Sequence, residues 1–257
     1  MTPFWKPMPY YALREKEVLK LFKRNNLSSS IAAIKIYILI CLTSNLDENG
    51  NYCTSLTYDQ LTKYASLSRK LVSNGLKKLY ELELLNFEGN KKKKYYLMGV
   101  KRTGKVFSET RFKSSQGYWA KLPFAGFVDG SGRITAFESM SNRSPVELNS
   151  LKLFIYLLSI RSKDQVSISV TLSKIRSKLD ISFQDIMIAI GFMQSIGMLY
   201  KVNLGVNTIS NYDAAFSINF LVCGWESLEW KPTYLSHDEW KNKMLAGSDA
   251  QWNENSR

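Results

Sequence analysis

Histidine and cysteine are scarce in this chain of 257 residues, which has one histidine and three cysteines. His237 lies near the C-terminal end, and Cys41, Cys53 and Cys223 show no Cys-x-x-Cys spacing. This shortage argues against a disulfide framework, structural zinc and the two-histidine metal site of a rolling-circle nickase. The acidic residues are scattered, without the cluster that a two-metal nuclease needs. We therefore expect no cofactor, no metal and no enzymatic activity.

Targeting signals and long apolar runs are also missing. The N-terminal stretch lacks the charged start and the apolar core of a signal peptide. The most apolar segment, residues 31–42, contains Lys35 and is too short to span a bilayer. We expect a cytoplasmic, nucleoid-associated protein with no membrane partner.

Acidic residues are few relative to basic ones, and the formal net charge is +13. Residues 1–113 hold 21 Lys and Arg against 9 Asp and Glu, whereas residues 114–257 hold 14 against 13. A strongly basic protein of this size usually binds a polyanion, and nucleic acid is the most common one. The first half therefore has the charge of a nucleic-acid-binding domain, and the second half is near neutral.

The two halves of the chain resemble each other when the sequence is shifted by 114 residues. At this offset Trp5 aligns with Trp119, and residues 51–57 (NYCTSLT) align with residues 165–171 (QVSISVT). Self-similarity of this kind indicates a repeated architecture. We predict an internal duplication with a first domain over residues 1–113, a second over 118–224 and a tryptophan-containing tail, disordered at its end, over 225–257.

The first half has the pattern of an apolar helix, a short strand, two helices separated by a turn, and a β-hairpin. Thr57 and Gln60 have the spacing of a capping box, and Ser68 is placed to cap the following helix. Apolar residues in that helix recur at helical spacing and define one buried stripe. The expected elements cover residues 29–43, 53–56, 58–65, 69–82 and 84–100.

This order of elements resembles the winged-helix superfamily over residues 29–100. The resemblance lies in element order and apolar spacing, since the fold has no diagnostic motif. We predict an α+β, mainly α, fold of two tandem winged-helix domains, each with a helix-turn-helix and a β-hairpin wing. In the second domain the expected helices cover residues 144–160, 171–179 and 182–196, and the expected strands cover 166–170, 197–203 and 214–222.

In a helix-turn-helix the second helix enters the major groove, where Arg and Lys pair with guanine and Asn with adenine. In the first domain we expect this helix to present Ser68, Arg69, Lys70, Ser73, Asn74, Lys77 and Lys78. The hairpin turn and the stretch after it add Lys91, Lys92, Lys93, Lys94, Lys101, Arg102 and Lys105. Cations that neutralise phosphates release counterions and so favour binding. We therefore predict double-stranded DNA binding by the first domain; the alternative is a solvated helix face.

The corresponding helix of the second domain, residues 182–196, contains no lysine or arginine. Its apolar residues cover more than one stripe, which favours a homodimer interface over simple burial in the domain's own core. The tail carries tryptophans at 225, 230 and 240, which either pack back on the second domain or bind a replication or transcription protein. Auxiliary phosphate contacts are possible at Lys174, Arg176 and Lys178.

Two fused winged-helix units in one basic chain resemble the replication initiators of plasmids and related mobile elements. The resemblance lies in architecture and length, and it implies binding to repeated origin sites, recruitment of a helicase or polymerase, and autorepression. A dimeric transcriptional repressor and a protein-interaction adaptor are the alternatives. A phosphate-binding loop over residues 99–106 (GVKRTGKV) is not expected, because Val106 stands where a magnesium-binding Ser or Thr is required.

Overall fold

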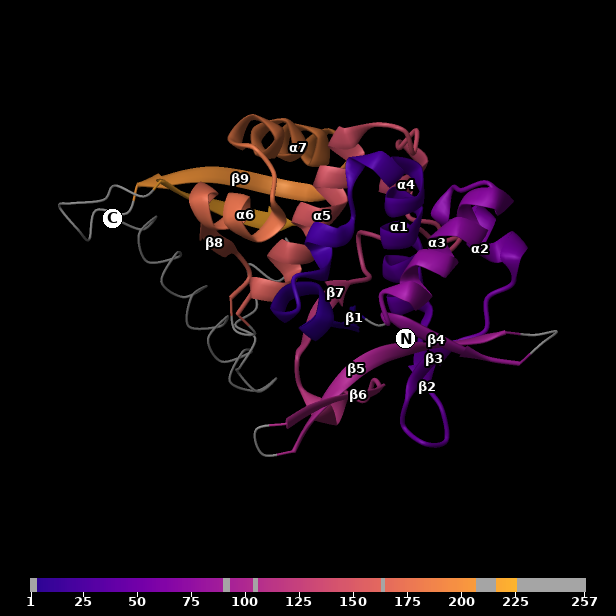
Figure 1. Cartoon of the computed structure of the whole chain (residues 1–257). Coiled ribbons are helices and arrows are strands. Elements are labelled where there is room, and N and C mark those ends of the chain that lie inside the picture. Colours follow the sequence, from indigo (N-terminus) through magenta and orange to yellow (C-terminus); the bar gives the residue numbers. More distant parts are fainter. Residues whose placement is uncertain (1–3, 90–92, 104–105, 163–164, 207–215, 226–257) are drawn as a thin grey trace, which may run out of the picture.

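The structure is a computed structural model that describes residues 4–89, 93–103, 106–162, 165–206 and 216–225 (Figure 1). The chain has a mixed α+β fold, in which η denotes a short helical turn. The first half contains β1 (Trp5–Pro9), η1 (Tyr11–Glu15), η2 (Val18–Leu21), η3 (Arg24–Asn26), α1 (Leu27–Thr43), β2 (Asn45–Leu46), β3 (Tyr52–Thr54), α2 (Tyr58–Ala65), α3 (Arg69–Glu81), β4 (Leu85–Glu88), β5 (Lys94–Thr103) and β6 (Val106–Arg111).

The second half repeats much of this order. It contains η4 (Ser114–Gln116), β7 (Trp119–Pro123), α4 (Thr135–Glu138), α5 (Pro145–Ile160), β8 (Ile168–Thr171), α6 (Leu172–Leu179), α7 (Phe183–Ser195), β9 (Leu199–Val206) and β10 (Phe216–Val222). Three pairs of elements, β1 and β7, α2 and α6, and α3 and α7, have equal lengths and begin 114 residues apart.

The strands form three sheets. The first half has the order β2-β3-β5-β4, with β6 also pairing with β5, and the second half has the order β8-β10-β9. The hairpin of β5 and β6 was not expected from the sequence. Its strands include residues 99–103 and Val106, so this part of the segment that resembles a phosphate-binding loop is extended β structure.

The N-termini of the paired helices are capped as the sequence predicts. The Thr57 hydroxyl accepts a hydrogen bond from the Gln60 backbone N–H at 3.2 Å, while the Gln60 side chain accepts one from the Thr57 N–H at 2.9 Å, which confirms the capping box. Ser68 accepts from the backbone of Leu71 at the start of α3. The hydroxyls of Thr171 and Ser182 cap α6 and α7 in the same way.

Helices α1 and α5 form the centre of the molecule. Residues 30–42 of α1 and 147–159 of α5 are all buried, and the two helices contact each other while α3 packs on α1 and α7 on α5. Within the described residues, one helical stretch, Arg24–Thr43, which is η3 together with α1, is long and apolar enough to cross a membrane, and most of it is buried inside the protein. A helix that is apolar on all sides and covered by neighbouring helices has the composition expected of a core helix.

The two halves are joined by the antiparallel pairing of β1 with β7. Pro7 pairs with Lys121 at the centre of the ladder, and Trp5 pairs with Pro123 at one end as Pro9 pairs with Trp119 at the other. Pro7 and Lys121, the central pair, are 114 residues apart. The two end pairs consist of the same two equivalent positions in opposite order, so the ladder is symmetric about its centre. The rings of Trp5 and Trp119 stack across it with centroids 5.4 Å apart.

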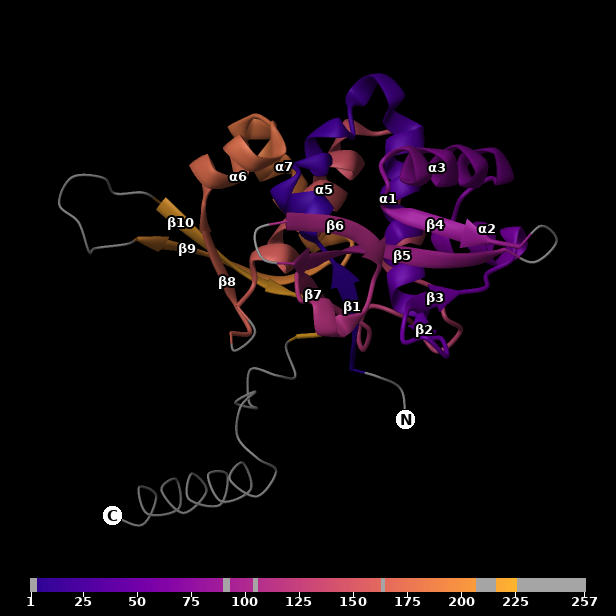
Figure 2. The same ribbon diagram turned by 60° about the horizontal axis from the view of Figure 1, so that its bottom comes forward.

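Each half also sends a segment onto the other half, as the two views of the chain show (Figures 1 and 2). The segment with η1 to η3 reaches α5, where the Arg14 guanidinium donates to the carbonyl of Ser159 at 2.7 Å. The segment around α4 reaches the first half, where the Asn142 amide donates to the carbonyl of Ser66 at 3.1 Å. The buried apolar residues of both halves consequently form one continuous cluster.

Candidate nucleic-acid interface

Helix α3 has one buried side and one polar side. Val72, Leu76 and Leu79 are buried against the core. Gly75 faces α1 so closely that a Cβ atom there would lie 2.8 Å from the Ile36 side chain, so a small residue is needed at this contact. The opposite side is exposed to solvent and presents Ser68, Arg69, Lys70, Ser73, Asn74 and Lys77.

Two of the three cations on this exposed side have acidic neighbours. Arg69 forms an ion pair with Asp59 of α2, and the Lys77 ammonium lies 3.9 Å from the Glu81 carboxylate. All four side chains are largely exposed, and ion pairs of this kind contribute little to stability. Lys70 has no acidic partner among the residues that the structure describes. The exposed side of α3 can therefore exchange its weak internal ion pairs for contacts with a polyanion.

Lys78 does not belong to this exposed face, contrary to the expectation from the sequence. Its ammonium donates to the Ser30 hydroxyl at 3.0 Å and lies 5.4 Å from the centre of the Phe22 ring. Burial lowers the pKa of Lys78. The side chain packs between α3 and the segment that precedes α1, so it holds the helix in place rather than facing solvent.

The hairpin of β4 and β5 lies on the same side of the molecule as α2 and α3 in both views (Figures 1 and 2). The Lys93 ammonium lies over the Phe87 ring at 4.5 Å, and the Lys94 ammonium lies 4.0 Å from the Asp47 carboxylate. A hydrogen bond with Tyr96 raises the pKa of Lys94, which keeps it charged. The remaining predicted cations of this turn, Lys91 and Lys92, lie outside the described residues.

The other predicted cations are at the far end of β5. Lys101 follows Lys94 by seven residues in one strand, which corresponds to about 23 Å. It lines a groove of about 520 Å³, whose other basic lining residues are Arg102, Arg111 and Lys113 and whose lining contains no acidic residue. Lys101 and Lys94 are therefore far apart, although Arg111 of the groove lies over the Tyr96 ring that the Lys94 ammonium also contacts. Lys105 lies outside the described residues.

The second half presents a different surface at the corresponding helix. Ile186, Ala189, Ile190 and Met193 of α7 are buried, so much of its apolar surface belongs to the core. Phe183, Met187 and Ile188 are nevertheless exposed by 42%, 48% and 46%, which leaves an apolar strip on the outer side.

The three auxiliary cations on α6 have different surroundings. Lys178 pairs with Glu17 at 3.2 Å, and the Arg176 guanidinium lies 5.0 Å from the centre of the Phe183 ring. Lys174 is exposed. Lys178 is therefore engaged in joining the halves, while Lys174 and Arg176 are both exposed.

The described part of the tail packs back on the protein, in agreement with one of the two expectations. Trp225 is buried, and its ring lies 6.2 Å from that of Phe4 and 4.3 Å from the Arg161 guanidinium. Gly224 precedes it with φ of +78°, and a Cβ atom there would collide with the carbonyl oxygen of Ala125. Trp230 and Trp240 lie outside the described residues.

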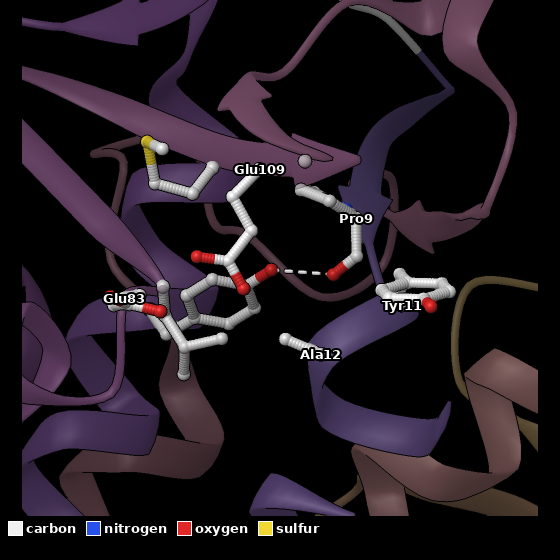
Figure 3. Close-up of a pocket in the computed structure, with 9 residues that line it drawn as sticks. Pro9, Tyr11, Ala12, Glu83 and Glu109 are labelled. Carbon is white, nitrogen blue, oxygen red and sulfur yellow. Dashed lines mark hydrogen bonds between the residues drawn. The ribbon is translucent and has the colours of Figure 1, made fainter. Parts of the chain in front are cut away.

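A small pocket beside β6 contains a pair of carboxyl groups that the sequence did not indicate (Figure 3). A hydrogen bond with Glu109 raises the pKa of Glu83, whereas an ion pair with Lys16 lowers the pKa of Glu109. The Tyr37 hydroxyl donates to the carbonyl of Pro9 at 2.5 Å in the same pocket. Its volume of about 10 Å³ has room for about one water molecule, so it is too small for an organic substrate.

Within the described part of the chain, no three His, Cys, Asp or Glu side chains are grouped so as to hold a metal ion. No family model matches the chain, and no curated protein matches it significantly.

Proposed function

We propose that the chain consists of two winged-helix units that arose by internal duplication. The proposal is supported by the common spacing of 114 residues between three pairs of elements and by the equivalent caps of α2 and α6 and of α3 and α7. The symmetric ladder of β1 and β7 further supports it, because equivalent segments of a duplicated chain can pair about a local two-fold axis.

The first unit, we infer, binds double-stranded DNA in a sequence-specific manner. The observation that carries this proposal is the exposed side of α3, which combines Lys70 with Asn74 and begins at an exposed N-terminus. In a helix-turn-helix these positions of the second helix contact base edges. The β4–β5 hairpin, which carries Lys93 and Lys94, lies on the same side of the molecule as α3 (Figure 1), and these lysines would contact the phosphate backbone.

The biological role that we favour is initiation of replication of a plasmid or mobile element. Two fused units of this kind can engage repeated sites in an origin and recruit a helicase or polymerase. The near-neutral second unit supports a division of labour, in which the first unit reads DNA and the second binds a protein.

A dimeric transcriptional regulator is the second candidate, and the exposed apolar strip of α7 favours it. An exposed strip that contains Phe183, Met187 and Ile188 is the kind of surface that a protein partner covers. A dimer formed there would present two copies of α3 to an operator palindrome. The third candidate is a protein-interaction adaptor that retains the fold without binding DNA.

Selection of fragments from the source genome or element would test the proposal. The full chain would be compared with a variant in which residues 91–94 are changed to alanine, at two salt concentrations. Lys201→Ala is the matched control and should retain binding, because Lys201 lies on β9, a strand of the corresponding hairpin in the second half. Clustered direct repeats that are lost in the four-lysine variant indicate an initiator, whereas a single palindrome beside a promoter indicates a regulator. Absence of enrichment by the unmodified chain contradicts sequence-specific DNA binding.

A further inference from the structure

A cleft of about 420 Å³ lies where the segment of η2 and η3 meets the second half. Its walls come from this segment, from α5 and from the turn between α6 and α7. The volume is within the range of pockets that bind small molecules. The charged residues that line the cleft are four cations, Lys20, Lys23, Arg24 and Lys152, and two carboxylates, Asp180 and Asp185.

Two polar side chains of α5 are buried in the wall of this cleft. Asn149 is 2% exposed and Lys152 is 4% exposed, and they lie one helical turn apart. The Asn149 Nδ2 has no hydrogen-bond partner within the described part of the protein. A buried donor that is left unpaired destabilises a fold, and such groups in native proteins have a specific reason. An acceptor atom from a ligand in the cleft would satisfy this donor.

Lys152 supplies further donors beside this amide. Its ammonium donates to the carbonyl of Leu179 at 2.8 Å, which uses one of its three N–H groups. Burial lowers the pKa of Lys152 to about 8, with Asp180 opposing this shift and Arg24 and Lys20 adding to it, so the group carries a proton at neutral pH for most of the time. A neighbouring anion would stabilise that charge.

The cations at the mouth of the cleft differ in their availability. Arg24 pairs with Asp185 at 2.7 Å, and Lys20 pairs with Glu17 at 2.7 Å. Lys23 is exposed and has no acidic partner within the described ranges. Four cations against two carboxylates leave the lining with a net positive charge, although Glu17 outside the lining also compensates Lys20. A lining with a net positive charge favours an anionic group such as a phosphate monoester, which carries a charge of about −1.5 to −2 at neutral pH.

We propose that this cleft binds a small phosphate monoester, whose phosphate oxygens accept hydrogen bonds from Asn149, Lys152 and Lys23. The organic part of the ligand occupies the remaining volume, since a phosphate alone would leave most of the cleft unfilled. This site goes beyond the proposed DNA binding, because its residues are separate from the exposed side of α3. The ligand would bridge the two halves, so its binding stabilises the folded chain.

Titration calorimetry on the full chain in phosphate-free buffer tests this proposal. Glycerol 3-phosphate and adenosine 5′-monophosphate are the probes, and glycerol and adenosine are their unphosphorylated counterparts. We expect at least one probe to bind saturably, with one equivalent per chain. Its affinity should be at least about tenfold higher than that of its unphosphorylated counterpart, a ratio that corresponds to about 1.4 kcal/mol.

Two variants locate the binding in the cleft. Asn149→Leu removes the unpaired buried donor, so it should retain folding while weakening probe binding by about tenfold. Lys23→Ala changes an exposed side chain and should weaken binding about fivefold without an effect on folding. Lys174→Ala, an exposed lysine on α6 outside the cleft, is the control and should bind the probe normally.

Three results would overturn the proposal. These are no saturable binding of either probe, equal binding of the phosphorylated and unphosphorylated compounds, or binding that both cleft variants leave unchanged. Displacement of the probe by a short DNA duplex, together with weaker duplex binding by Lys23→Ala, would instead assign the cleft to the DNA backbone. Duplex binding by variants of α3, measured in parallel, reports separately on the proposed DNA function.

Discussion

At the scale of single residues, Lys35 best shows how the two halves depend on each other. It is fully buried in α1, where its ammonium donates to the Phe137 carbonyl at 3.0 Å and to the Asn142 side chain at 2.9 Å. Burial lowers the pKa of Lys35 to about 7, although Glu147 opposes the shift. A lysine in an apolar helix is visible in the sequence, but its partners more than 100 residues away are not.

The lowered pKa of Lys35 predicts how stability changes with pH. Between pH 7 and 10.5 the unfolded chain binds more protons at this residue than the folded one, so the free energy of unfolding rises with pH, by up to about 1.4 kcal/mol per pH unit. Lys152 adds a similar rise above pH 8. For Lys35→Met, we expect the free energy of unfolding, measured by urea denaturation, to rise between pH 7.5 and 9.5 by about 2 kcal/mol less than that of the unmodified chain.

The exposed lysine Lys70 offers a matched control for this measurement. Lys70→Met should retain the pH dependence of the unmodified chain, because its side chain is exposed on α3. An unchanged pH dependence in Lys35→Met would show that the buried ammonium is not the group responsible.

At the scale of elements, the sequence predicted helices and their caps reliably, but it did not predict which distant segments surround a residue or pair with a strand. The caps at Thr57 and Ser68 and the helices that follow them were predicted correctly, because capping and apolar spacing act within a few residues. Lys78 was misplaced because its surroundings are set by Phe22, which belongs to a distant segment. Strand β6 was missed because it is largely exposed, with Val106 and Phe107 outside the core at its start, so its sequence shows no alternation of apolar and polar residues.

The polar side of α3 leads to a prediction about specificity. Asn74→Ala should weaken binding to the preferred site by about 1–3 kcal/mol, or roughly fivefold to 150-fold, and relax the preference at one base pair. Binding to unrelated duplexes should change much less, since asparagine is uncharged. Fluorescence anisotropy with the selected site and its single-base variants gives both values.

Gln184→Ala on α7 is the control for this variant, because Gln184 is exposed on the corresponding helix of the second half. It should bind like the unmodified chain. Equal losses in Asn74→Ala and Gln184→Ala would contradict the assignment of base recognition to α3.

At the scale of the whole molecule, the sequence predicts the repeat but not how the repeats are joined. The shared spacing of 114 residues is visible from Trp5 and Trp119 onward. The stacking of these two rings, and the symmetric ladder around them, depend on the three-dimensional pairing of segments that are each too short to specify a partner. The same is true of the basic residues, since Lys94 and Lys101 lie about 23 Å apart along β5.

The apolar strip on α7 predicts self-association of the chain. Met187 is 48% exposed between Phe183 and Ile188 on the outer side of the molecule. We expect sedimentation equilibrium to detect dimers at micromolar concentration and Met187→Glu to weaken them by at least about tenfold, because a charge would be buried in the contact. Gln194→Glu, an exposed change on the same helix, should dimerise normally. A chain that stays monomeric at all concentrations would rule out this interface.

The salt dependence of duplex binding tests the central claim most directly. For the unmodified chain, the logarithm of the association constant should fall linearly with the logarithm of salt concentration, by about 0.9 for each phosphate contacted. In Lys93→Ala/Lys94→Ala the slope should become shallower by about 1.8, while Lys201→Ala on β9 should leave it unchanged. Identical slopes for the unmodified chain and the double variant would contradict DNA binding through the β4–β5 hairpin of the first half.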